Sequence, residues 1–417
     1  MFKRVRKKIL CISSAFVLFS AVSHSDAVNV DWPYYSFNVT NTLNQDRDDL
    51  ICIEQSQANF LITKKHAYLV TIEGKQVPSQ VAPCSIANES LGLLVKQALT
   101  AKQSSKLNVY VNTQATLSSQ HQVPYTYAEL QVRVGGQWQQ DKLAGGQYVP
   151  VESYQLPDDH TVGNRLFKYE GLGWESESMA YRYYFDHRGS IDIFAKQKNG
   201  LVLENVGIDG DDYHVLDDWG LDVLKVGPSL GLGGIAAWQN NTVFGANKFD
   251  QLSTTINSGN LTSDVRLTYQ NWQVADNNGD LDLTLSINAN TSLTRVKAQT
   301  LAPIPQFATG IVKHDVDVIK KVNNESTWSV LATWGKQSLN KDNLGMAIFF
   351  KTSQLEKLTQ DKYNELVVFK PTNAPLYYYF SANWQAAPKG ANTKQQYIED
   401  LDKTLALLNN PIQVSQK

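Results

Sequence analysis

Residues 173–234 hold the densest set of side chains in this sequence that could do chemistry. Proton-transfer groups come from two histidines and two tyrosines in that stretch, His187, His214, Tyr184 and Tyr213. Imidazole is the commonest general acid or base in proteins, and a tyrosine hydroxyl can donate a proton to a leaving group. These four are the predicted catalytic residues. A histidine is more often structural than catalytic, and that alternative stays open for both.

The same stretch supplies cations and aromatic rings of the kind that hold an acidic sugar. Guanidinium and ammonium groups neutralise a carboxylate, and indole rings stack against sugar rings. One further histidine, His314, lies later in the chain and also has charged neighbours. The predicted substrate-binding residues are Arg182, Arg188, Lys196, Trp174, Trp219 and His314.

Two strands joined by a tight turn are expected to position the first group. Residues 179–185 alternate so that Arg182 and Tyr184 share one face, and residues 186–189 have the composition of a turn. Residues 190–196 return as a second strand, with Asp192 and Lys196 on one side. The pattern predicts a hairpin that carries charges beside aromatic rings.

The glycine-rich run at residues 227–234 follows two groups of acidic residues, at 209–212 and 217–222. It lacks the Gly-Lys-Ser/Thr ending of a phosphate loop and opens no amphipathic helix. Close backbone packing, or a bulge beside a ligand cleft, is the better interpretation.

Acid-rich loops suggest a calcium site, because carboxylate and amide oxygens bind this ion. The two sets are Asp209 with Asp211 and Asp212, and Asp276 with Asn278 and Asp280. Neither matches the twelve-residue spacing of an EF-hand, and solvated turn residues are the favoured alternative. We predict no metal and no cofactor, with calcium as the exception to test.

Several enzyme classes lack their motifs here. The sequence has no His-Glu-x-x-His and no kinase motif. It does have 9 Trp, 19 Tyr and 15 Phe, enough for both a core and sugar-stacking platforms.

The N-terminus has the layout of a secretory signal. Five basic residues within the first eight precede an apolar run at residues 9–22, and Ser25-Asp26-Ala27 offers small residues for cleavage. The predicted signal is residues 1–27, the mature start is Val28, and the location is the periplasm or the exterior. An uncleaved anchor is the alternative, which the short run disfavours.

Net charge limits the class of binding partner, and the number of cysteines limits the possible disulfides. Removing the signal takes five of 38 basic and one of 40 acidic residues, which leaves 33 and 39 and a net charge of −6. That balance argues against nucleic acid as a partner. Cys52 and Cys84 remain, and they either pair in an oxidising compartment or lie buried as free thiols.

Short alternating segments run through most of the chain and predict an all-β fold. The clearest are residues 35–39, 67–72, 106–111, 128–133, 265–269, 281–287 and 346–350. One helix closes the chain, because apolar residues from Ile398 to Leu408 recur at helical spacing. Thr393 with Gln396 forms a capping box, and residues 409–411 supply the stop. A single large supersandwich over residues 28–417, of the galactose-mutarotase-like kind, is the first prediction, and two stacked β domains are the alternative.

The pattern of residues resembles a bacterial domain family long labelled only as of unknown function and encoded among polysaccharide-degradation genes. The resemblance covers nearly the whole mature chain. It rests on residues 39–41 with Arg47, 174–177, 181–184, 192–196, 213–214, 219–222, 226–234, 309–311, 313–314, 334–335 and Trp384. It implies substrates that contain uronic acids, as in ulvan, pectin or alginate breakdown, and one relative in that group is an oligosaccharide dehydratase.

Elimination from a uronate needs three groups: one that neutralises the carboxylate, a base for the C5 proton and an acid for the oxygen leaving C4. The residues predicted above supply all three, so a dehydratase or exo-acting lyase is the first functional hypothesis. A glycoside hydrolase with a carboxylate pair, Glu175 with Asp192 or Asp222, is the second. A non-catalytic sugar-binding protein is the third.

Overall fold

The computed structural model describes residues 31–84, 90–114, 123–208, 211–300, 304 and 306–417. The predicted signal at residues 1–27 lies outside these ranges. Within them the chain forms thirty strands, one α-helix and three single-turn 3-10 helices, so the predicted all-β fold with a C-terminal helix is confirmed. The 3-10 helices are η1 (Gln55–Gln57), η2 (Leu203–Asn205) and η3 (Thr352–Gln354).

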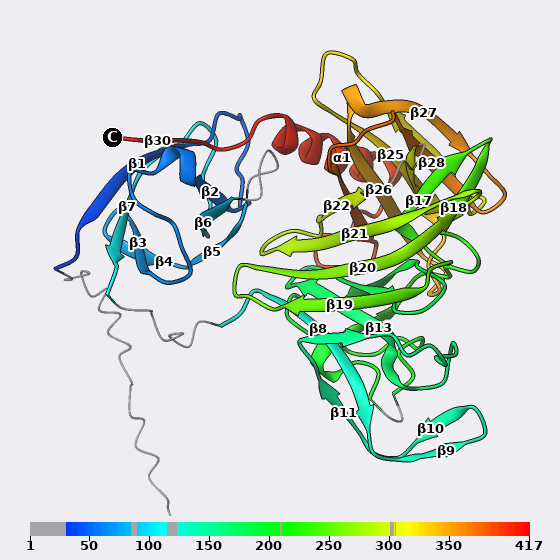
Figure 1. Cartoon of the computed structure of the whole chain (residues 1–417). Coiled ribbons are helices and arrows are strands. Elements are labelled where there is room, and N and C mark those ends of the chain that lie inside the picture. The colour runs from blue at the N-terminus through cyan, green and yellow to red at the C-terminus, as the bar shows by residue number, and fades with distance from the viewer. Residues whose placement is uncertain (1–30, 85–89, 115–122, 209–210, 301–303, 305) are drawn as a thin grey trace, which may run out of the picture.

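A small sandwich is built from the N-terminal strands (Figure 1). Its core holds Phe37, Val70, Leu93 and Val109, each fully buried. The first sheet has the order β30 (Gln413–Gln416), β1 (Tyr34–Thr40), β7 (Ser104–Asn112), β3 (Ala67–Ile72) and β4 (Lys75–Val77). The second has the order β2 (Ile51–Glu54), β6 (Leu91–Val95) and β5 (Ser79–Pro83).

The large sandwich has a nine-stranded sheet as one layer (Figure 1). Its order is β12 (Ser153–Gln155), β19 (Gln251–Asn257), β20 (Thr262–Val274), β21 (Asn277–Asn288), β22 (Thr294–Thr300), β29 (Leu376–Trp384), β26 (Asn343–Lys351), β25 (Trp328–Lys336) and β24 (Asp317–Lys321). Neighbouring strands are antiparallel throughout, which fits the alternation of buried and exposed residues in β20 and β29.

Two further sheets form the opposite layer. One has the order β11 (Gln147–Pro150), β8 (Thr126–Val134), β13 (Phe167–Ser176), β14 (Ala180–Tyr184), β15 (Ile191–Lys196) and β16 (Gly220–Asp222). The other has the order β18 (Thr242–Gly245), β17 (Leu232–Gln239), β23 (Phe307–Val312), β28 (Asn364–Phe369) and β27 (Leu355–Gln360). A hairpin of β9 (Gln137–Gln139) and β10 (Lys142–Ala144) projects from this layer.

A glycine joins the two sheets of that layer. Gly231 pairs with Ile191 in a parallel bridge, its φ is +70°, and a Cβ there would lie 1.8 Å from the Ile191 carbonyl oxygen. The register between β17 and β23 shifts between Leu232 and Gly234. The predicted close packing and bulge in the glycine run are therefore confirmed, and only glycine fits at residue 231.

Helix α1 (Lys394–Asn409) packs on the outer face of β25 and β26 through Tyr397 and Leu401. It begins as predicted, because the Thr393 hydroxyl accepts a hydrogen bond from the Gln396 backbone nitrogen and the capping box is complete. Among the described residues, no helix is long and apolar enough to span a membrane.

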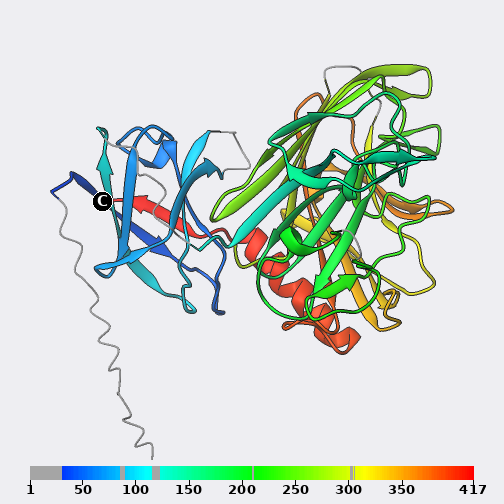
Figure 2. The same ribbon diagram turned by 90° about the horizontal axis from the view of Figure 1, so that it is seen from below.

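The chain returns to the small sandwich after the helix, and β30 pairs with β1 there (Figure 2). Arg47 donates a 2.7 Å hydrogen bond to the Asn410 carbonyl at the helix end. The Gln80 side chain on β5 accepts from the Leu261 nitrogen at 2.6 Å and donates to the Thr262 oxygen at 3.1 Å. Because these contacts and the shared C-terminal strand tie the two sandwiches together, we propose that residues 28–417 act as one unit.

Candidate functional site

The six-stranded sheet carries a layer of charged side chains on the face turned away from the main core. Tyr181 and Tyr183 of β14 point into that core, and Arg182 and Tyr184 point to the other side. The register places Arg182 opposite Asp192 of β15, which confirms the predicted hairpin and its charged face. Residues 202–206, Tyr213 and Trp219 pack over this face, so the charged groups are buried although they lie outside the core.

Arg182 is the centre of this layer, with 1% of its side chain exposed. Its guanidinium contacts the Asp192 carboxylate and donates to Asp222 at 2.7 Å and to the Tyr184 hydroxyl at 2.6 Å. The same group donates to the Tyr213 hydroxyl at 3.2 Å. One buried cation therefore fixes residues from three strands and from the covering loop, and charge-assisted hydrogen bonds of this kind are the strong ones.

The two carboxylates that share this cation are not equivalent. Burial, followed by the neighbouring Asp192, raises the pKa of Asp222 well above its usual range, and Arg182 opposes the shift. The cause is that one guanidinium cannot compensate two buried carboxylates fully.

Two more buried ion pairs flank Arg182 on the same face. The Lys168 ammonium lies 2.6 Å from a Glu129 carboxylate oxygen, and that oxygen also accepts from the Tyr169 hydroxyl at 2.5 Å. Lys196 lies 2.5 Å from Glu175, and both side chains are fully buried. Each of these buried charges lies beside an opposite charge, because a charge that is buried without a partner costs much free energy.

A bulge in β13 shapes the edge of the site. The register with β8 shifts between Phe167 and Leu172, and inside the shift Tyr169 and Glu170 have φ values of 39° and 63°. Two consecutive non-glycine residues in this region are strained, and such strain is concentrated at functional sites. Arg182 donates to the Tyr169 carbonyl at 3.2 Å and so helps to hold the bulge.

A cavity of about 290 Å³ opens above the bulge. One wall comes from residues 163–170, and the other from the loop that carries Tyr213 and His214. Its polar lining consists of Tyr148, Arg165, Tyr169, Glu170, Asp211, Asp212, Tyr213 and His214. Of the predicted catalytic residues, Tyr213 and His214 line this cavity.

His214 is about half exposed and lies between two carboxylates. Its Nδ1 is 3.3 Å from Asp212, and its Nε2 is 3.7 Å from the buried Asp222. Carboxylates beside both ring nitrogens orient the imidazole.

Tyr213 is the adjacent proton donor. Burial raises the pKa of its hydroxyl, and the nearby Arg182 partly offsets that increase. The hydroxyl is therefore protonated near neutral pH. Its oxygen accepts from Arg182, and within the described part of the chain no group accepts a hydrogen bond from this hydroxyl.

Arg165 provides a cation at the cavity wall. It is exposed, has a φ of 64°, and forms no ion pair within the described part of the chain. Arg188, in contrast, pairs with Glu170 at 3.0 Å and with Asp186 at 2.5 Å, and its guanidinium lies over the Tyr184 ring. Arg165 is the guanidinium that a ligand carboxylate could take as its partner.

The other predicted residues lie outside the cavity lining. Tyr184 is buried beneath it and donates to Asp192 at 2.7 Å. Trp174 is fully buried and donates to the Thr294 hydroxyl at 2.8 Å, and Lys196 is held by Glu175. Neither Trp174 nor Lys196 can touch a solute unless the sheet rearranges, so we leave these two residues out of the site.

Three more predicted residues also lie outside the cavity lining. His187 stacks on Phe249, with ring centres 4.6 Å apart. His314 contacts the Gln337 amide at 3.3 Å, and Trp219 packs edge-on against Phe194. The sequence offered no way to rank His187 below His214.

The acidic residues take roles that their spacing did not indicate. Glu175 is saturated by Lys196 and by the backbone nitrogens of Val202 and Leu203. Within the described ranges, no group of three or more His, Cys, Asp or Glu side chains is placed to hold a metal ion. Asp209 of the first calcium set lies outside the described residues, and the calcium hypothesis stays a prediction.

Arg165, Tyr148 and Glu170 were missed from the sequence. They precede the stretch that drew attention: Tyr148 lies on β11, Arg165 lies just before β13, and Glu170 lies in the β13 bulge. A paired glycine or asparagine would have indicated left-handed backbone at residues 169 and 170, but the chain has Tyr and Glu there.

Comparison with known proteins gives a family. The family model described as a domain of unknown function, DUF4861, matches residues 39–414. The chain belongs to the DUF4861 family. A relative named uncharacterized protein P7, from Formosa agariphila, is 22% identical over 293 residues, which is 67% of this chain and 66% of that protein.

Two solved structures from Enterococcus faecalis were also found. One is a protein in glycosyl hydrolase family 38, with 7% identity and a TM-score of 0.41 over 92% of this chain and 47% of the other. The second is an alpha-mannosidase, with 7% identity and a TM-score of 0.45 over 92% and 46%. The chain thus spans about half the length of these structures. Since the description of the DUF4861 family gives no activity, the function is argued from the site.

Proposed function

We propose that this DUF4861 protein is a carbohydrate-active carbon–oxygen lyase that acts on uronic-acid-containing oligosaccharides by β-elimination. The reaction would be that of an oligosaccharide dehydratase or an exo-acting lyase. One observation carries the proposal: His214, the Tyr213 hydroxyl and the guanidinium of Arg165 line the same cavity. These are a base, an acid and a partner for a carboxylate.

Each group has a step in the proposed reaction. Arg165 binds the uronate carboxylate and stabilises the negative charge that develops there as the C5 proton leaves. His214 takes that proton, the electron pair forms the C4–C5 double bond, and the C4–O bond breaks. Tyr213 gives its proton to the departing oxygen. No other reactant is needed, because His214 then releases its proton to solvent and Tyr213 takes one up from solvent, which returns both residues to their starting states.

Arg182 is a positioning residue in this scheme. It holds the Tyr213 oxygen at 3.2 Å and would stabilise the tyrosinate left after proton transfer. It also anchors Asp222, which faces His214. Because its side chain is 1% exposed, it acts on the substrate only through these neighbours.

A glycoside hydrolase is the second candidate, because Glu170, Asp211 and Asp212 line the same cavity. Hydrolysis needs two carboxylates on either side of the scissile bond. Glu170 is paired with Arg188, and Asp211 accepts from the Gly207 nitrogen at 2.5 Å, so these acids are partly engaged. The pair favoured from the sequence, Glu175 with Asp192 or Asp222, is buried below the cavity.

We also propose a periplasmic or secreted location. The Cys52–Cys84 disulfide supports it, since structural disulfides persist in oxidising compartments.

The test is to incubate residues 28–417 with defined uronate oligosaccharides and to follow the absorbance of the conjugated double bond. His214→Ala and Tyr213→Phe should each lower kcat by about 10²- to 10⁴-fold. His187→Ala is the matched control, because that histidine stacks on Phe249 outside the cavity. Equal rates for His214→Ala and His187→Ala would remove His214 from the reaction. Binding without turnover would favour a sugar-binding protein.

A further inference from the structure

A second cavity, of about 660 Å³, lies between the two sandwiches. It has more than twice the volume of the cavity at His214, and the two share no lining residue. Its first wall consists of Lys64 and residues 80–83 of β5, and its second is the outer face of β19 to β22 with Tyr377 of β29. We call it the intersandwich cleft.

The register of the nine-stranded sheet arranges the second wall in two rows. The first row reads Thr255, Arg266, Thr284, Lys297 and Tyr377, and the second reads Asn257, Asp264, Ser286 and Arg295. Neighbouring strands lie about 4.8 Å apart, so the backbones at Arg266 and Lys297, two strands apart, are separated by about 10 Å. The cleft therefore presents two cations of the first row, Arg266 and Lys297, two strands apart on an extended surface, with Arg295 in the second row.

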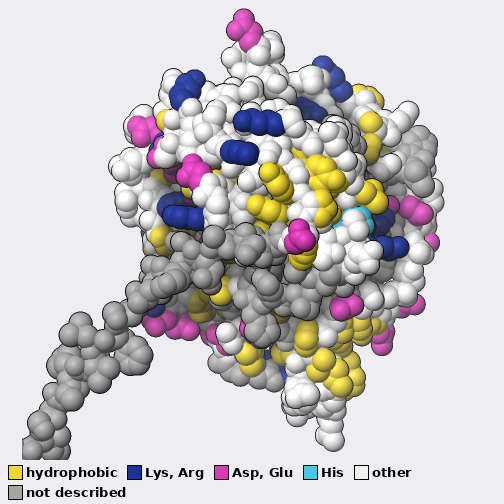
Figure 3. Space-filling view, turned by 90° about the vertical axis from the view of Figure 1, so that its left-hand side faces the viewer, with side chains coloured by type: hydrophobic (Ala, Val, Ile, Leu, Met, Phe, Trp, Pro, Cys, Tyr) yellow, Lys and Arg dark blue, Asp and Glu magenta, His cyan; other side chains and the backbone are white. Residues whose placement is uncertain are grey.

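The charge of the cleft differs from that of the chain as a whole. Four cations line it, Lys64, Arg266, Arg295 and Lys297, against the two acids Glu152 and Asp264, and Arg266 also pairs with Asp282 outside the lining at 3.0 Å. The full chain has a formal net charge of −2. On the coloured part of the face in Figure 3, basic side chains are scattered among neutral and acidic ones. Positive charge is thus concentrated in the cleft.

The remaining lining is rich in hydroxyl and amide groups, with one aromatic ring. Hydrogen-bonding groups come from Gln80, Asn257, Ser258, Thr284 and Ser286, and the ring is that of Tyr377. This combination suits a ligand that carries both negative charge and many hydroxyls. A single-stranded nucleic acid would need several stacking rings, which the described lining does not provide.

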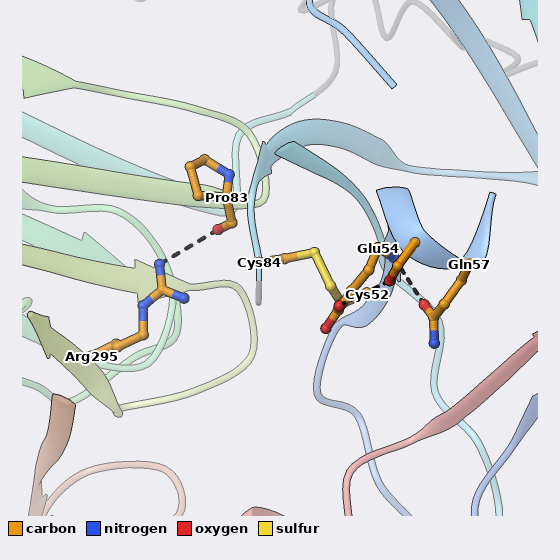
Figure 4. Close-up of a disulfide and its surroundings, with 7 residues drawn as sticks. Cys52, Glu54, Gln57, Pro83, Cys84 and Arg295 are labelled. Carbon is orange, nitrogen blue, oxygen red and sulfur yellow. Dashed lines mark hydrogen bonds between the residues drawn. A yellow bond between two sulfur atoms is a disulfide. The ribbon is translucent and has the colours of Figure 1, made fainter. Parts of the chain in front are cut away.

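The two walls are held in place without a ligand. Gln80 bridges β5 to the start of β20 through hydrogen bonds of 2.6 and 3.1 Å. Arg295 on β22 reaches the Pro83 carbonyl at 3.5 Å, as Figure 4 shows, and the adjacent Cys84 is bonded to Cys52 of β2. The disulfide therefore fixes the end of β5 that forms one side of the cleft, and a preformed cleft lowers the entropic cost of binding.

We propose that the intersandwich cleft binds an extended anionic oligosaccharide, with carboxylate or sulfate groups on its cations and its hydroxyls on the polar rows. The site would hold a stretch of glycan away from the cavity at His214. The ligand class rests on the proposed function, whereas the charge and shape of the cleft do not.

The experiment is titration calorimetry on the His214→Ala protein, so that turnover does not consume the ligand. Four probes of similar length are compared: an oligogalacturonate, a chondroitin sulfate fragment, a neutral cello-oligosaccharide and a single-stranded DNA. At least one of the two acidic glycans should bind, with affinity that falls as salt is added. The oligogalacturonate carries carboxylates alone and the chondroitin sulfate fragment carries both carboxylates and sulfates, so binding of the second probe alone would indicate that sulfate is the group recognised. No binding of either, or equal binding of the neutral glycan or of DNA, would overturn the proposal.

Charge variants locate the binding. Lys297→Gln and Arg266→Gln should each raise the Kd of the acidic glycan by about fivefold, which corresponds to about 1 kcal/mol. Lys320→Gln is the matched control, because it removes an exposed lysine from β24 at the far edge of the same sheet. Lys297→Arg keeps the charge and should keep the affinity. Equal loss in the control, or no loss in the cleft variants, would refute the cleft as the site.

The two proposals fail in different ways. Wild-type protein that binds the glycan in the cleft but forms no unsaturated product contradicts the lyase and leaves the cleft standing. If the wild-type protein carries out the elimination, and Lys297→Gln and Arg266→Gln bind the acidic glycan as tightly as the wild type does, only the cleft proposal is contradicted.

Discussion

Removing Arg182 should destabilise the protein far more than neutralising Asp222, although both belong to one cluster. Arg182→Met leaves Asp192 and Asp222 facing each other with about 1% of each side chain exposed. Loss of one partner from a buried ion pair costs about 3–5 kcal/mol of unfolding free energy. Asp222→Asn keeps the Arg182–Asp192 pair and an amide oxygen that can accept from Arg182, so it should cost about 1 kcal/mol or less.

The pH dependence of the same variants follows from the raised pKa of Asp222. A carboxyl with an unfolded pKa near 3.9 and a higher folded pKa binds its proton more tightly when the chain is folded. Its contribution to stability is present below the unfolded pKa and is lost as the pH rises through the folded pKa. Asp222→Asn cannot lose this proton, so its stability should fall less as the pH is raised above about 4.

Urea unfolding followed by tryptophan fluorescence, repeated over a pH series, measures both effects. The expected order of unfolding free energy is wild type, then Asp222→Asn, then Arg182→Met, with at least about 2 kcal/mol between the last two. If Asp222→Asn were as unstable as Arg182→Met, with the pH profile of the wild type, then Asp222 would be an essential ionised partner and the reasoning would be wrong.

Three other variants test the fold. Cys52→Ser opens a disulfide between residues 32 apart and should lower stability by about 3–4 kcal/mol in the chain-entropy account; an unchanged thermal midpoint would contradict it. Gly231→Ala, at φ +70° and 1.8 Å from the Ile191 oxygen, should cost about 2–3 kcal/mol or more, seen as loss of folded protein by circular dichroism. Thr393→Ala should cost about 1 kcal/mol by removing the cap of α1, and Thr393→Ser, which keeps the hydroxyl, should restore most of it in the same denaturation assay.

Local patterns in the sequence predicted much of the fold. The seven strands named from the sequence lie within β1, β3, β7, β8, β20, β21 and β26. In β1, β7, β20 and β21 buried residues alternate with more exposed ones, whereas residues 346–350 of β26 are apolar and buried on both faces. The helix was predicted with its cap, since Thr393 and Gln396 act within one turn. The glycine run was interpreted correctly as close packing.

The site was harder to predict, because its assembly depends on contacts between distant segments. Arg182 and Tyr184 were placed on one face, yet nothing in the spacing showed that Arg182 would be buried with two carboxylates. Glu175 and Lys196 drew attention as functional types, but they compensate each other inside the sheet. The left-handed backbone at Tyr169 and Glu170 is carried by residues other than glycine, so the sequence did not predict it, and Arg165 lies just before this strand at the cavity wall.

The most direct test of the central claim is the mass of the product formed from a defined uronate oligosaccharide in water enriched in heavy oxygen. Elimination predicts products with a conjugated double bond and no solvent oxygen, with loss of one water if the leaving group is a hydroxyl. Products that carry one heavy oxygen and no double bond would show hydrolysis and would contradict the assignment of His214, Tyr213 and Arg165 as the groups of a lyase.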